Sequence, residues 1–449
     1  MLLKEKWLRL EGLTMNSDLS SSPESFTSKL DTPKTVAIVG GGISSLVLAD
    51  YLFKKLSNLK VTLFCKDNDL AQQGSSNKQG AVYPLLQAGD SLISNFYGRA
   101  FKHATSYYKH RLPGYETVPH QWTGVLQQAF NSSMPTKYEE IATKWPNIVE
   151  FIDAKASSKI ANIDTPYSSL YFSSGGWLNP LRFCQWLGAE LQSSHDFTIQ
   201  YNSEVQKVQR NENDNVWSLH FDKKQRDFDR VVLCTGVDSP NIDYSDVNTI
   251  PIAGVLGQVS SFNPNTTINK LRTVLCHKGY ITPSDGEHQA FGATFEKTWQ
   301  NNEPTELARQ QNINQIKKVF PNTNWAQSIS INDINHDNTA IRATTPDHLP
   351  IAGEIIDWAW VEHYIDNNNG KYKRADKIRG SHDNPLQGLY CLTGLGARGI
   401  TSAPILADML SSVLANEPFS NNAVASVLPT VAPVRFMLRE YKRAKGKPN

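Results

Sequence analysis

The sequence predicts a mixed α/β protein built on a parallel sheet, and three segments carry that prediction. VAIVGGGISSLVLADYL (Val36–Leu52) reads as a short apolar strand, a glycine turn and a helix. RVVLCTG (Arg230–Gly236) and GLYCLTG (Gly388–Gly394) are two further apolar strands that end in Thr-Gly. Short β-rich runs alternate with helical patterns between these segments, which is the order expected of βαβ units.

Length and composition exclude several classes of protein. A chain of 449 residues can form two or three domains, and no run approaches the roughly 18 apolar residues of a membrane helix. The first 14 residues lack the apolar core of a signal peptide. Five widely spaced cysteines indicate neither a disulfide framework nor a zinc site, so we expect a cytoplasmic protein without a bound metal. With 45 basic and 43 acidic side chains, net charge says nothing about partners.

The first unit has the spacing of a dinucleotide-binding fold. The strand Val36–Val39 precedes the glycines, apolar residues recur at helical spacing after them, and KVTLF (Lys60–Phe64) follows as a second strand. Gly40 permits the tight turn, and Gly42 lets backbone N–H groups approach a pyrophosphate at the helix N-terminus. Ser45 replaces the third glycine of the fingerprint, which is tolerable; the alternative is a glycine turn without a cofactor.

The end of the second strand departs from the general pattern. An acidic residue that binds the adenosine ribose usually stands there, but Cys65 occupies the place and Asp67 lies two residues on. Either Asp67 reaches back to the ribose or other groups hold it.

Two later segments predict helices that begin at defined residues. In GGWLNPLRFCQWLGAEL, Asn179 is an N-cap and Pro180 stands at the first helical position. YCLTGLGARGITSAPILADML (Tyr390–Leu410) repeats the order of strand, glycine turn and helix, and such a helix N-terminus favours negative charge. Arg398 in this turn is either a surface arginine or functional, and its Gly-Ala-Arg-Gly setting favours the second interpretation.

Two stretches are expected to lie outside the compact domains. Residues 15–34 are rich in Ser, Thr and Pro and read as a flexible linker, so folded sequence should begin near Thr35. Residues 361–385 are polar and turn-rich, which predicts an exposed insertion.

Together these segments resemble the FAD-dependent amine oxidoreductases of the glycine oxidase and D-amino acid oxidase type. Within that family they are similar to the oxidoreductase half of the bifunctional tRNA-modifying enzyme MnmC. The resemblance is carried by VAIVGGGISS, GSSNKQGAVYPLL (Gly74–Leu86), SSGGWLNP, GYITPSDGEHQAFGATFE (Gly279–Glu296), IRATTPDHLPIAG (Ile341–Gly353) and LTGLGARGITSAPILAD. It extends from about Thr35 to about Pro418.

The resemblance implies FAD as the cofactor and a nested architecture. An FAD-binding Rossmann-like domain would be built from residues 35–90, 170–250 and 335–420, and an interleaved antiparallel-sheet substrate domain from 91–169 and 251–334. A flexible segment, 1–34, and a basic tail, 421–449, would flank them. The expected cofactor-binding positions are Gly40, Gly41, Gly42, Ile43, Ser44, Cys65, Asp67, Asn77, Gly80, Thr235, Gly236, Leu395, Gly396, Arg398, Gly399 and Ile400.

The same resemblance implies a substrate within tRNA. This is 5-carboxymethylaminomethyl(-2-thio)uridine at the wobble position of the anticodon stem-loop. Cutting the C–N bond to the carboxymethyl group would leave 5-aminomethyluridine and glyoxylate. The full family enzyme then methylates the amine with S-adenosylmethionine in an N-terminal domain, for which the 34 residues before the first strand are too short. We therefore expect a methyltransferase elsewhere or in a missing domain, and either a fragment or a one-activity version here.

Three residues are expected to hold the reacting amine. The substrate is locally an N-substituted glycine, and its carboxylate is best fixed by an arginine fork. Arg342 and Arg398 occupy positions resembling the family's carboxylate-binding arginines, and Tyr280 resembles a tyrosine that closes the same pocket. The alternatives are a surface ion pair for Arg342 and a packed strand tyrosine for Tyr280. His348 is expected to be structural, because hydride loss to a flavin needs no strong base.

A tRNA partner needs a basic surface, and the C-terminal tail is the first candidate. VRFMLREYKRAKGKPN (Val434–Asn449) carries six basic residues against one acid. Its expected phosphate contacts are Arg435, Arg439, Lys442 and Arg443. The alternative is a solvated helix end. KYKRADKIR (Lys371–Arg379) is a second candidate of the same kind.

Two other functions stay open from the sequence. A small-molecule amine oxidase acting on glycine or sarcosine would have the same pocket and no nucleic acid. A non-catalytic flavoprotein scaffold could bind tRNA for a separate methyltransferase, although a scaffold has no need of paired arginines.

Overall fold

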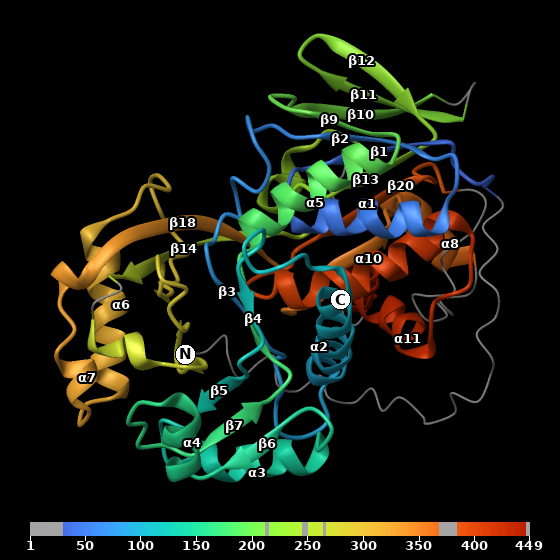
Figure 1. The fold of residues 1–449 in the computed structure, drawn as a ribbon. Coiled ribbons are helices and arrows are strands. Elements are labelled where there is room, and N and C mark those ends of the chain that lie inside the picture. Colours follow the sequence, from blue (N-terminus) through green and yellow to red (C-terminus); the bar gives the residue numbers. More distant parts are fainter. Residues whose placement is uncertain (1–29, 212–214, 245–249, 264–265, 368–383, 446–449) are drawn as a thin grey trace.

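The scaffold of the computed structural model is a six-stranded sheet with the order β19-β20-β13-β1-β2-β9 (Figure 1). The structure describes residues 30–211, 215–244, 250–263, 266–367 and 384–445. Five strands of the sheet run parallel: β1 (Thr35–Val39), β2 (Lys60–Phe64), β9 (Phe197–Gln200), β13 (Arg230–Leu233) and β20 (Leu389–Thr393). The sixth, β19 (Ile351–Glu354), pairs antiparallel with β20. The predicted parallel sheet is confirmed.

Alternating side chains give this sheet two apolar faces, and each is covered. Ile38 and Leu63 point to one face, which packs against α1 (Ile43–Lys55), α5 (Pro180–Ser194) and α10 (Gly399–Ala415). Ala37 and Phe64 point to the other, which packs against a small antiparallel sheet. That sheet consists of β10 (Val205–Asn211), β11 (Val216–Phe221) and β12 (Lys224–Phe228). Burial on both faces explains why the parallel strands are nearly uniformly apolar.

Local sequence decides where the covering helices begin. The Asn179 side chain accepts a hydrogen bond from the Arg182 backbone N–H at 3.0 Å, and Pro180 opens α5, as predicted. At α1 and α10 the N-cap residues, Gly42 and Arg398, supply no side-chain capping bond. Their first N–H groups are therefore left to loops or ligands at the carboxyl edge of the sheet.

The second large sheet has eight strands in the order β18-β14-β17-β16-β15-β5-β7-β6. They are β5 (Val125–Gln128), β6 (Glu150–Ile152), β7 (Ser169–Phe172), β14 (Ala253–Phe262), β15 (Val274–Cys276), β16 (Tyr280–Ile281), β17 (Ala290–Gly292) and β18 (Ile334–Thr344). All neighbours pair antiparallel except β5 and β15. This agrees with the predicted antiparallel-sheet substrate domain. Figure 1 shows β14 and β18 reaching from the parallel-sheet body toward α6 (Glu306–Val319).

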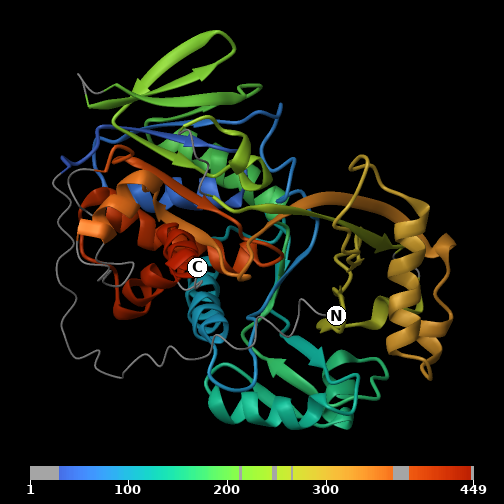
Figure 2. The same ribbon diagram turned by 180° about the vertical axis from the view of Figure 1, so that it is seen from behind.

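Helices and short strands complete the second sheet and join the two halves. Apolar residues of α6 and α7 (Asn324–Gln327) form one core with Phe262 and Phe291 of the sheet. At the other end lie α3 (Met134–Lys144) and α4 (Ala154–Ala161), seen from both sides in Figures 1 and 2. A three-stranded sheet connects the two halves, with the order β3-β8-β4. Its strands are β3 (Gly80–Val82), β8 (Gly176–Leu178) and β4 (His120–Gln121).

Two elements lie in a different sheet or layer from the one their sequence position suggested. Strand β18 pairs with β14 along its length, so residues 335–344 belong to the eight-stranded sheet and not to the nucleotide-binding half. Helix α2 (Leu92–Arg111), expected in the substrate domain, packs on α10, and its Tyr108 hydroxyl donates to the Ile400 carbonyl at 2.9 Å. Long-range pairing, which composition does not reveal, decides both placements.

The two stretches expected to be loose are partly ordered. Residues 15–29 of the expected linker lie outside the described residues, but Arg230 donates to the Asp31 carbonyl and the Lys34 N–H to Asp229, both at 2.7 Å. Residues 30–34 are thus fixed to the body. Of the expected insertion, 361–367 form part of α8 (Trp358–Asn367), and 368–383 lie outside the described residues.

The C-terminal segment folds onto the body as two helices. Helix α11 (Asn422–Val431) packs against α10, and α12 (Val434–Lys445) shares an apolar cluster with α8. Within the described ranges, no helix combines the length and the apolar character that a bilayer crossing requires.

Candidate active site

A cavity of about 760 Å³ begins at the carboxyl edge of the parallel sheet and extends to the eight-stranded sheet. Ligand pockets typically enclose about 300–1,000 Å³, so this one suits a large ligand. Every expected cofactor-binding position except Cys65 lines it, and so do the three expected catalytic residues. The structure therefore brings residues from distant parts of the sequence onto one wall.

The three glycines of the first turn have different surroundings. Gly40 has φ +124°, and a Cβ there would lie 2.4 Å from the Cys234 carbonyl oxygen at the end of β13. A Cβ on Gly41 would lie 2.4 Å from the Cys65 sulfur. At Gly42 the nearest atom is the Ser75 hydroxyl oxygen, at 3.3 Å. The first two glycines thus permit close packing, whereas the third leaves the backbone at the start of α1 open to the cavity.

Cys65 and Asp67 have separate roles at the end of β2. Cys65 is buried beneath the glycine turn, does not line the cavity, and burial raises the pKa of its thiol to about 11. Asp67 lines the cavity and accepts a hydrogen bond from the Gln73 side chain at 2.9 Å. Of the two, Asp67 is the one placed to meet a ligand.

The loop Gly74–Gly80 connects the glycine turn to the eight-stranded sheet. The Ile43 N–H donates to the Ser75 hydroxyl at 3.1 Å, and the Asn77 amide donates to the Tyr280 hydroxyl at 2.8 Å. Gly80 lies where a Cβ would meet Ile400 at 2.2 Å, so it allows β3 to pack on the start of α10. This loop sets the distance between the two ends of the cavity.

A second helix N-terminus faces the same cavity. Gly394 and Gly396 have φ +70° and +58°, which glycine adopts without strain, and they turn the chain from β20 into α10. The Gly396 N–H donates to the Ala343 carbonyl at 2.8 Å and so fixes this turn to β18. Two helix N-termini, each without a side-chain cap, thus open onto one cavity, an arrangement that fits a dinucleotide cofactor.

Arg342 projects from β18 across Gly257, which leaves room for its guanidinium. A Cβ on Gly257 of the neighbouring strand would lie 2.2 Å from the Arg342 guanidinium. The guanidinium donates to the Thr294 carbonyl at 3.1 Å, and burial lowers the pKa of Arg342. No carboxylate in the described part of the chain forms an ion pair with it. A buried, charged fork without a counterion on a cavity wall is suited to an anionic ligand.

Tyr280 is held on the same wall by two contacts. Its hydroxyl accepts from the Asn77 amide and donates to the Gln79 carbonyl at 3.1 Å. Burial raises the pKa of Tyr280 to about 12, although Asn77 and the charge of Arg342 lower it in part. Tyr280 is therefore a neutral phenol with a fixed orientation next to the guanidinium.

Arg398 lies between two aromatic rings at the start of α10. Its guanidinium is 5.0 Å from the centre of the Tyr83 ring and 5.8 Å from that of Tyr97, and it donates to the Tyr83 hydroxyl at 3.3 Å. The Nε atom is buried without a hydrogen-bond partner among the described residues. The aromatic rings hold the charge in place without neutralising it.

Charged side chains divide the cavity wall into two halves. The acids come from the half around the glycine turn: Asp67, Glu204 and Asp238. From residue 257 onward the described wall residues include no acid, and the basic ones are Lys278, Arg342 and Arg398. The second half of the cavity is therefore complementary to negative charge.

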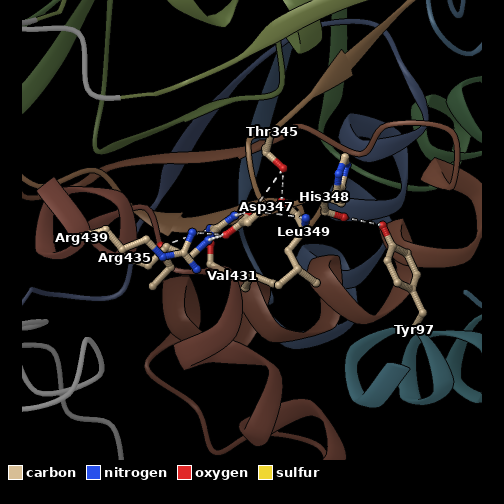
Figure 3. A network of polar contacts seen from close by, with 9 residues as sticks. Tyr97, Thr345, Asp347, His348, Leu349, Val431, Arg435 and Arg439 are labelled. Atoms are coloured by element: carbon tan, nitrogen blue, oxygen red, sulfur yellow. Dashed lines mark hydrogen bonds and ion pairs between the residues drawn. The ribbon is translucent and has the colours of Figure 1, made fainter. Parts of the chain in front are cut away.

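The expected basic tail begins with an arginine that is buried and not solvated. Arg435 is only 6% exposed and forms a bidentate contact with Asp347, at 3.0 and 3.1 Å (Figure 3). Arg439 contacts the same carboxylate at 2.6 Å. Arg435 is thus committed to the interior, because α12 docks on the loop that follows β18. Arg443 is exposed, and the side chain of Lys442 lies outside the described residues, as does the second basic candidate, Lys371–Arg379.

His348 lies away from the cavity. It has φ +61°, its side chain is exposed, and its carbonyl accepts from the Tyr97 hydroxyl at 3.3 Å. The residue thus shapes the loop between β18 and β19, and its ring lines no part of the cavity.

Sequence reasoning missed three residues of this site. Tyr83 and Phe295 lie inside the stretches that carried the resemblance, so their aromatic character was a usable signal. Gly257 was not detectable, because its role depends on which residue of β18 lies beside it.

Comparison with known proteins identifies the family. Residues 35–413 match the family described as FAD dependent oxidoreductase (DAO). The chain is 33% identical over 441 residues to a protein of Pseudoalteromonas translucida named tRNA 5-methylaminomethyl-2-thiouridine biosynthesis bifunctional protein MnmC. That match covers 96% of this chain and 63% of the relative, so the chain spans less than two thirds of the relative's length.

Two solved structures share the fold at low sequence identity. Glycine oxidase from Geobacillus kaustophilus superposes with a TM-score of 0.67 at 15% identity, covering 86% of this chain and 96% of that one. L-proline dehydrogenase from P. horikoshii gives 0.69 at 15%, covering 94% and 100%. The family match and a cavity that fits a dinucleotide agree: the chain belongs to the DAO family of FAD-dependent oxidoreductases, enzymes whose cofactor is FAD.

Proposed function

We propose that this chain oxidises the secondary amine of 5-carboxymethylaminomethyl(-2-thio)uridine at the wobble position of tRNA. The products are 5-aminomethyl(-2-thio)uridine and glyoxylate. The name of the relative from Pseudoalteromonas translucida, which refers to the biosynthesis of such a uridine, supports the substrate class. FAD supplies the hydride acceptor.

The observation that carries this proposal is the unpaired Arg342 on the cavity wall. A carboxylate fits the guanidinium fork of Arg342, and Tyr280, whose hydroxyl proton is donated to the Gln79 carbonyl, lies on the same cavity wall. Arg398 adds a second positive charge beside the start of α10. A carboxymethyl group on an amine suits this part of the cavity, because its anionic carboxylate is joined to the nitrogen through a single methylene carbon.

The residues of this chain bind and orient, and the bond changes occur in the substrate. The methylene between the nitrogen and the carboxylate loses a hydride, and the nitrogen loses a proton, which gives an imine. Water then adds to the imine carbon, and the C–N bond breaks to leave the amine and glyoxylate. Arg342 binds the carboxylate and Tyr280 closes the same wall, so the methylene is held in one orientation. The N-terminus of α10 favours negative charge that develops on the acceptor.

This assignment predicts how the rate depends on pH. The amine must be neutral to release hydride, so the rate should rise with pH until the amine is deprotonated. Because burial raises the pKa of Tyr280 to about 12, its phenol stays protonated over that range and keeps its hydrogen bonds. The arginines stay charged throughout. The pKa of the substrate amine, and not the pKa of a protein group, therefore sets the acidic limb of the pH–rate profile.

The product amine would be consumed by a methyl transfer. The relative is named a bifunctional protein, and this chain matches 63% of its length. We propose that an S-adenosylmethionine-dependent methyltransferase acts on the same nucleoside after this chain.

The experiment that tests the proposal uses purified, FAD-loaded protein and tRNA that carries the carboxymethylaminomethyl group. The tRNA is digested to nucleosides and analysed by mass spectrometry, and glyoxylate is trapped as a hydrazone. We expect the carboxymethyl nucleoside to disappear in step with glyoxylate. A Gly42→Asp variant, which places a carboxylate where the backbone meets the cofactor, should lack both FAD and activity.

Sarcosine provides the comparison with a small-molecule oxidase. Turnover of sarcosine together with unchanged tRNA would replace the proposal by the small-molecule alternative. An intact nucleoside and an unreduced flavin with both substrates would favour the scaffold.

A further inference from the structure

Phe295 is exposed in an unusual place. Among the described residues, the large hydrophobic side chains most exposed to solvent are Leu92, Tyr201, Phe295 and Leu307. Of these only Phe295, 64% exposed, lines the cavity. Single exposed hydrophobic residues are common on surfaces, but an aromatic ring at the rim of a binding cavity is placed to contact a ligand.

The backbone on both sides of Phe295 is fixed. The Thr294 N–H donates to the Gln258 carbonyl at 3.2 Å, and the Thr294 carbonyl accepts from Arg342. Glu296 and Leu256 exchange two backbone hydrogen bonds, both at 2.9 Å. The ring is therefore presented from a rigid segment that also carries the partner of Arg342. A rigid aromatic side chain binds a flat partner at low cost in conformational entropy.

The neighbourhood of Phe295 favours an anionic partner. Tyr280 pairs with Gly292, so the segment before Tyr280 and the segment after Gly292 leave the sheet at the same edge. Lys278, on the first of these segments, is exposed and also lines the cavity. This half of the wall carries no acid among its described residues. An exposed ring and an exposed cation on the wall of one basic cavity form the combination by which proteins hold an unpaired nucleotide.

We propose that Phe295 stacks on the nucleobase next to the modified uridine and that Lys278 contacts an adjacent phosphate. This inference rests on the proposed function, and it adds the way in which an unpaired RNA strand is held while one base enters the cavity. Stacking accepts any base, because every base has a π-face. The site is thus specific for an unpaired strand without reading its sequence.

The test measures binding of two RNA probes by fluorescence anisotropy. One is the anticodon stem-loop, and the other is a fully paired duplex with the same number of phosphates. Phe295→Ala should weaken stem-loop binding about 5- to 150-fold, the range for one lost stacking contact, and leave duplex binding unchanged. Phe295→Trp should restore stem-loop binding. Leu307→Ala is the matched control, because Leu307 is 70% exposed but lies off the cavity wall.

Other outcomes separate this inference from the proposed function. Equal stem-loop affinity in wild type and Phe295→Ala would overturn the stacking role. So would an equal loss for stem-loop and duplex, because that loss would not depend on unpaired bases. If wild type itself does not distinguish the stem-loop from the duplex and leaves the nucleoside intact, the proposed function fails. FAD content and melting temperature of each variant confirm that the fold is intact.

Discussion

Two pairs of arginines lie in opposite settings in this molecule. Arg342 and Arg398 face the cavity, and no described carboxylate forms an ion pair with either. Arg435 and Arg439 share Asp347, which lies in the loop between β18 and β19 (Figure 3). The first pair is open to a ligand, and the second pair is closed by the protein. Charge counted along the sequence does not separate the two, whereas the partner of each guanidinium does.

The largest effect is expected from removing the shared acid of the closed pair. Asp347→Ala leaves Arg435 buried without its main counterion, although the Val431 and Leu349 carbonyls still accept from it. Removing one partner of a buried ion pair costs about 3–5 kcal/mol of unfolding free energy, and the carbonyl contacts place this variant at the lower end of that range. Urea denaturation followed by tryptophan fluorescence measures the change.

A control and a pH series sharpen that result. Arg439→Gln should cost less than about 1 kcal/mol, because the Arg439 side chain is 44% exposed. Burial alone would raise the pKa of Asp347, but the hydrogen bond and charge of Arg435 and the charge of Arg439 outweigh it and lower the pKa. This stabilisation is present above about pH 4 and is lost as pH falls through the folded pKa. Wild type should lose stability in this pH range more steeply than Asp347→Ala. Parallel curves would show that Asp347 does not stabilise the fold through Arg435 and Arg439.

The contrast also shows how far the sequence reaches. Local patterns located the first glycine turn and the Asn179 cap, because turns and caps depend on a few neighbouring residues. Arg342 was expected only from the family resemblance. The sequence could not show that Arg435 is buried, because its partner lies 88 positions away in the chain. The same holds for Gly257, since its meaning depends on the register between β14 and β18. Patterns of neighbouring residues do not reveal which distant segments of the chain pair with one another.

Substitution of Arg342, in the open pair, is expected to slow turnover and to change the unfolding free energy little. Arg342→Leu should keep FAD and reduce it more slowly with modified tRNA, because the substrate carboxylate loses a charge-assisted fork. Such a contact contributes about 1.5–3 kcal/mol, or about 10- to 150-fold in rate. Anaerobic stopped-flow at the flavin absorption band measures it. Stability should change little, since no described acid loses its partner.

Gly257→Ala gives a second route to the same defect. The added Cβ would lie 2.2 Å from the Arg342 guanidinium, so the side chain must move while its charge remains. We expect slower reduction than in wild type with FAD content and stability nearly unchanged. If both variants reduce at the wild-type rate, the carboxylate is held elsewhere, and Arg398 is the next residue to test.

The smallest effect concerns what remains of the basic tail. Arg435 and Arg439 are engaged with Asp347, and the part that Arg443, an exposed residue of α12, takes in tRNA binding stays a prediction. A single phosphate contact changes the slope of log affinity against log salt by about one unit or less. Arg443→Gln should therefore flatten the salt dependence of tRNA binding by about that amount. Arg226→Gln is the matched control, because Arg226 is an exposed arginine on β12 that does not line the cavity. Its slope should equal that of wild type. An unchanged slope in Arg443→Gln would show that Arg443 contacts no phosphate of the bound tRNA.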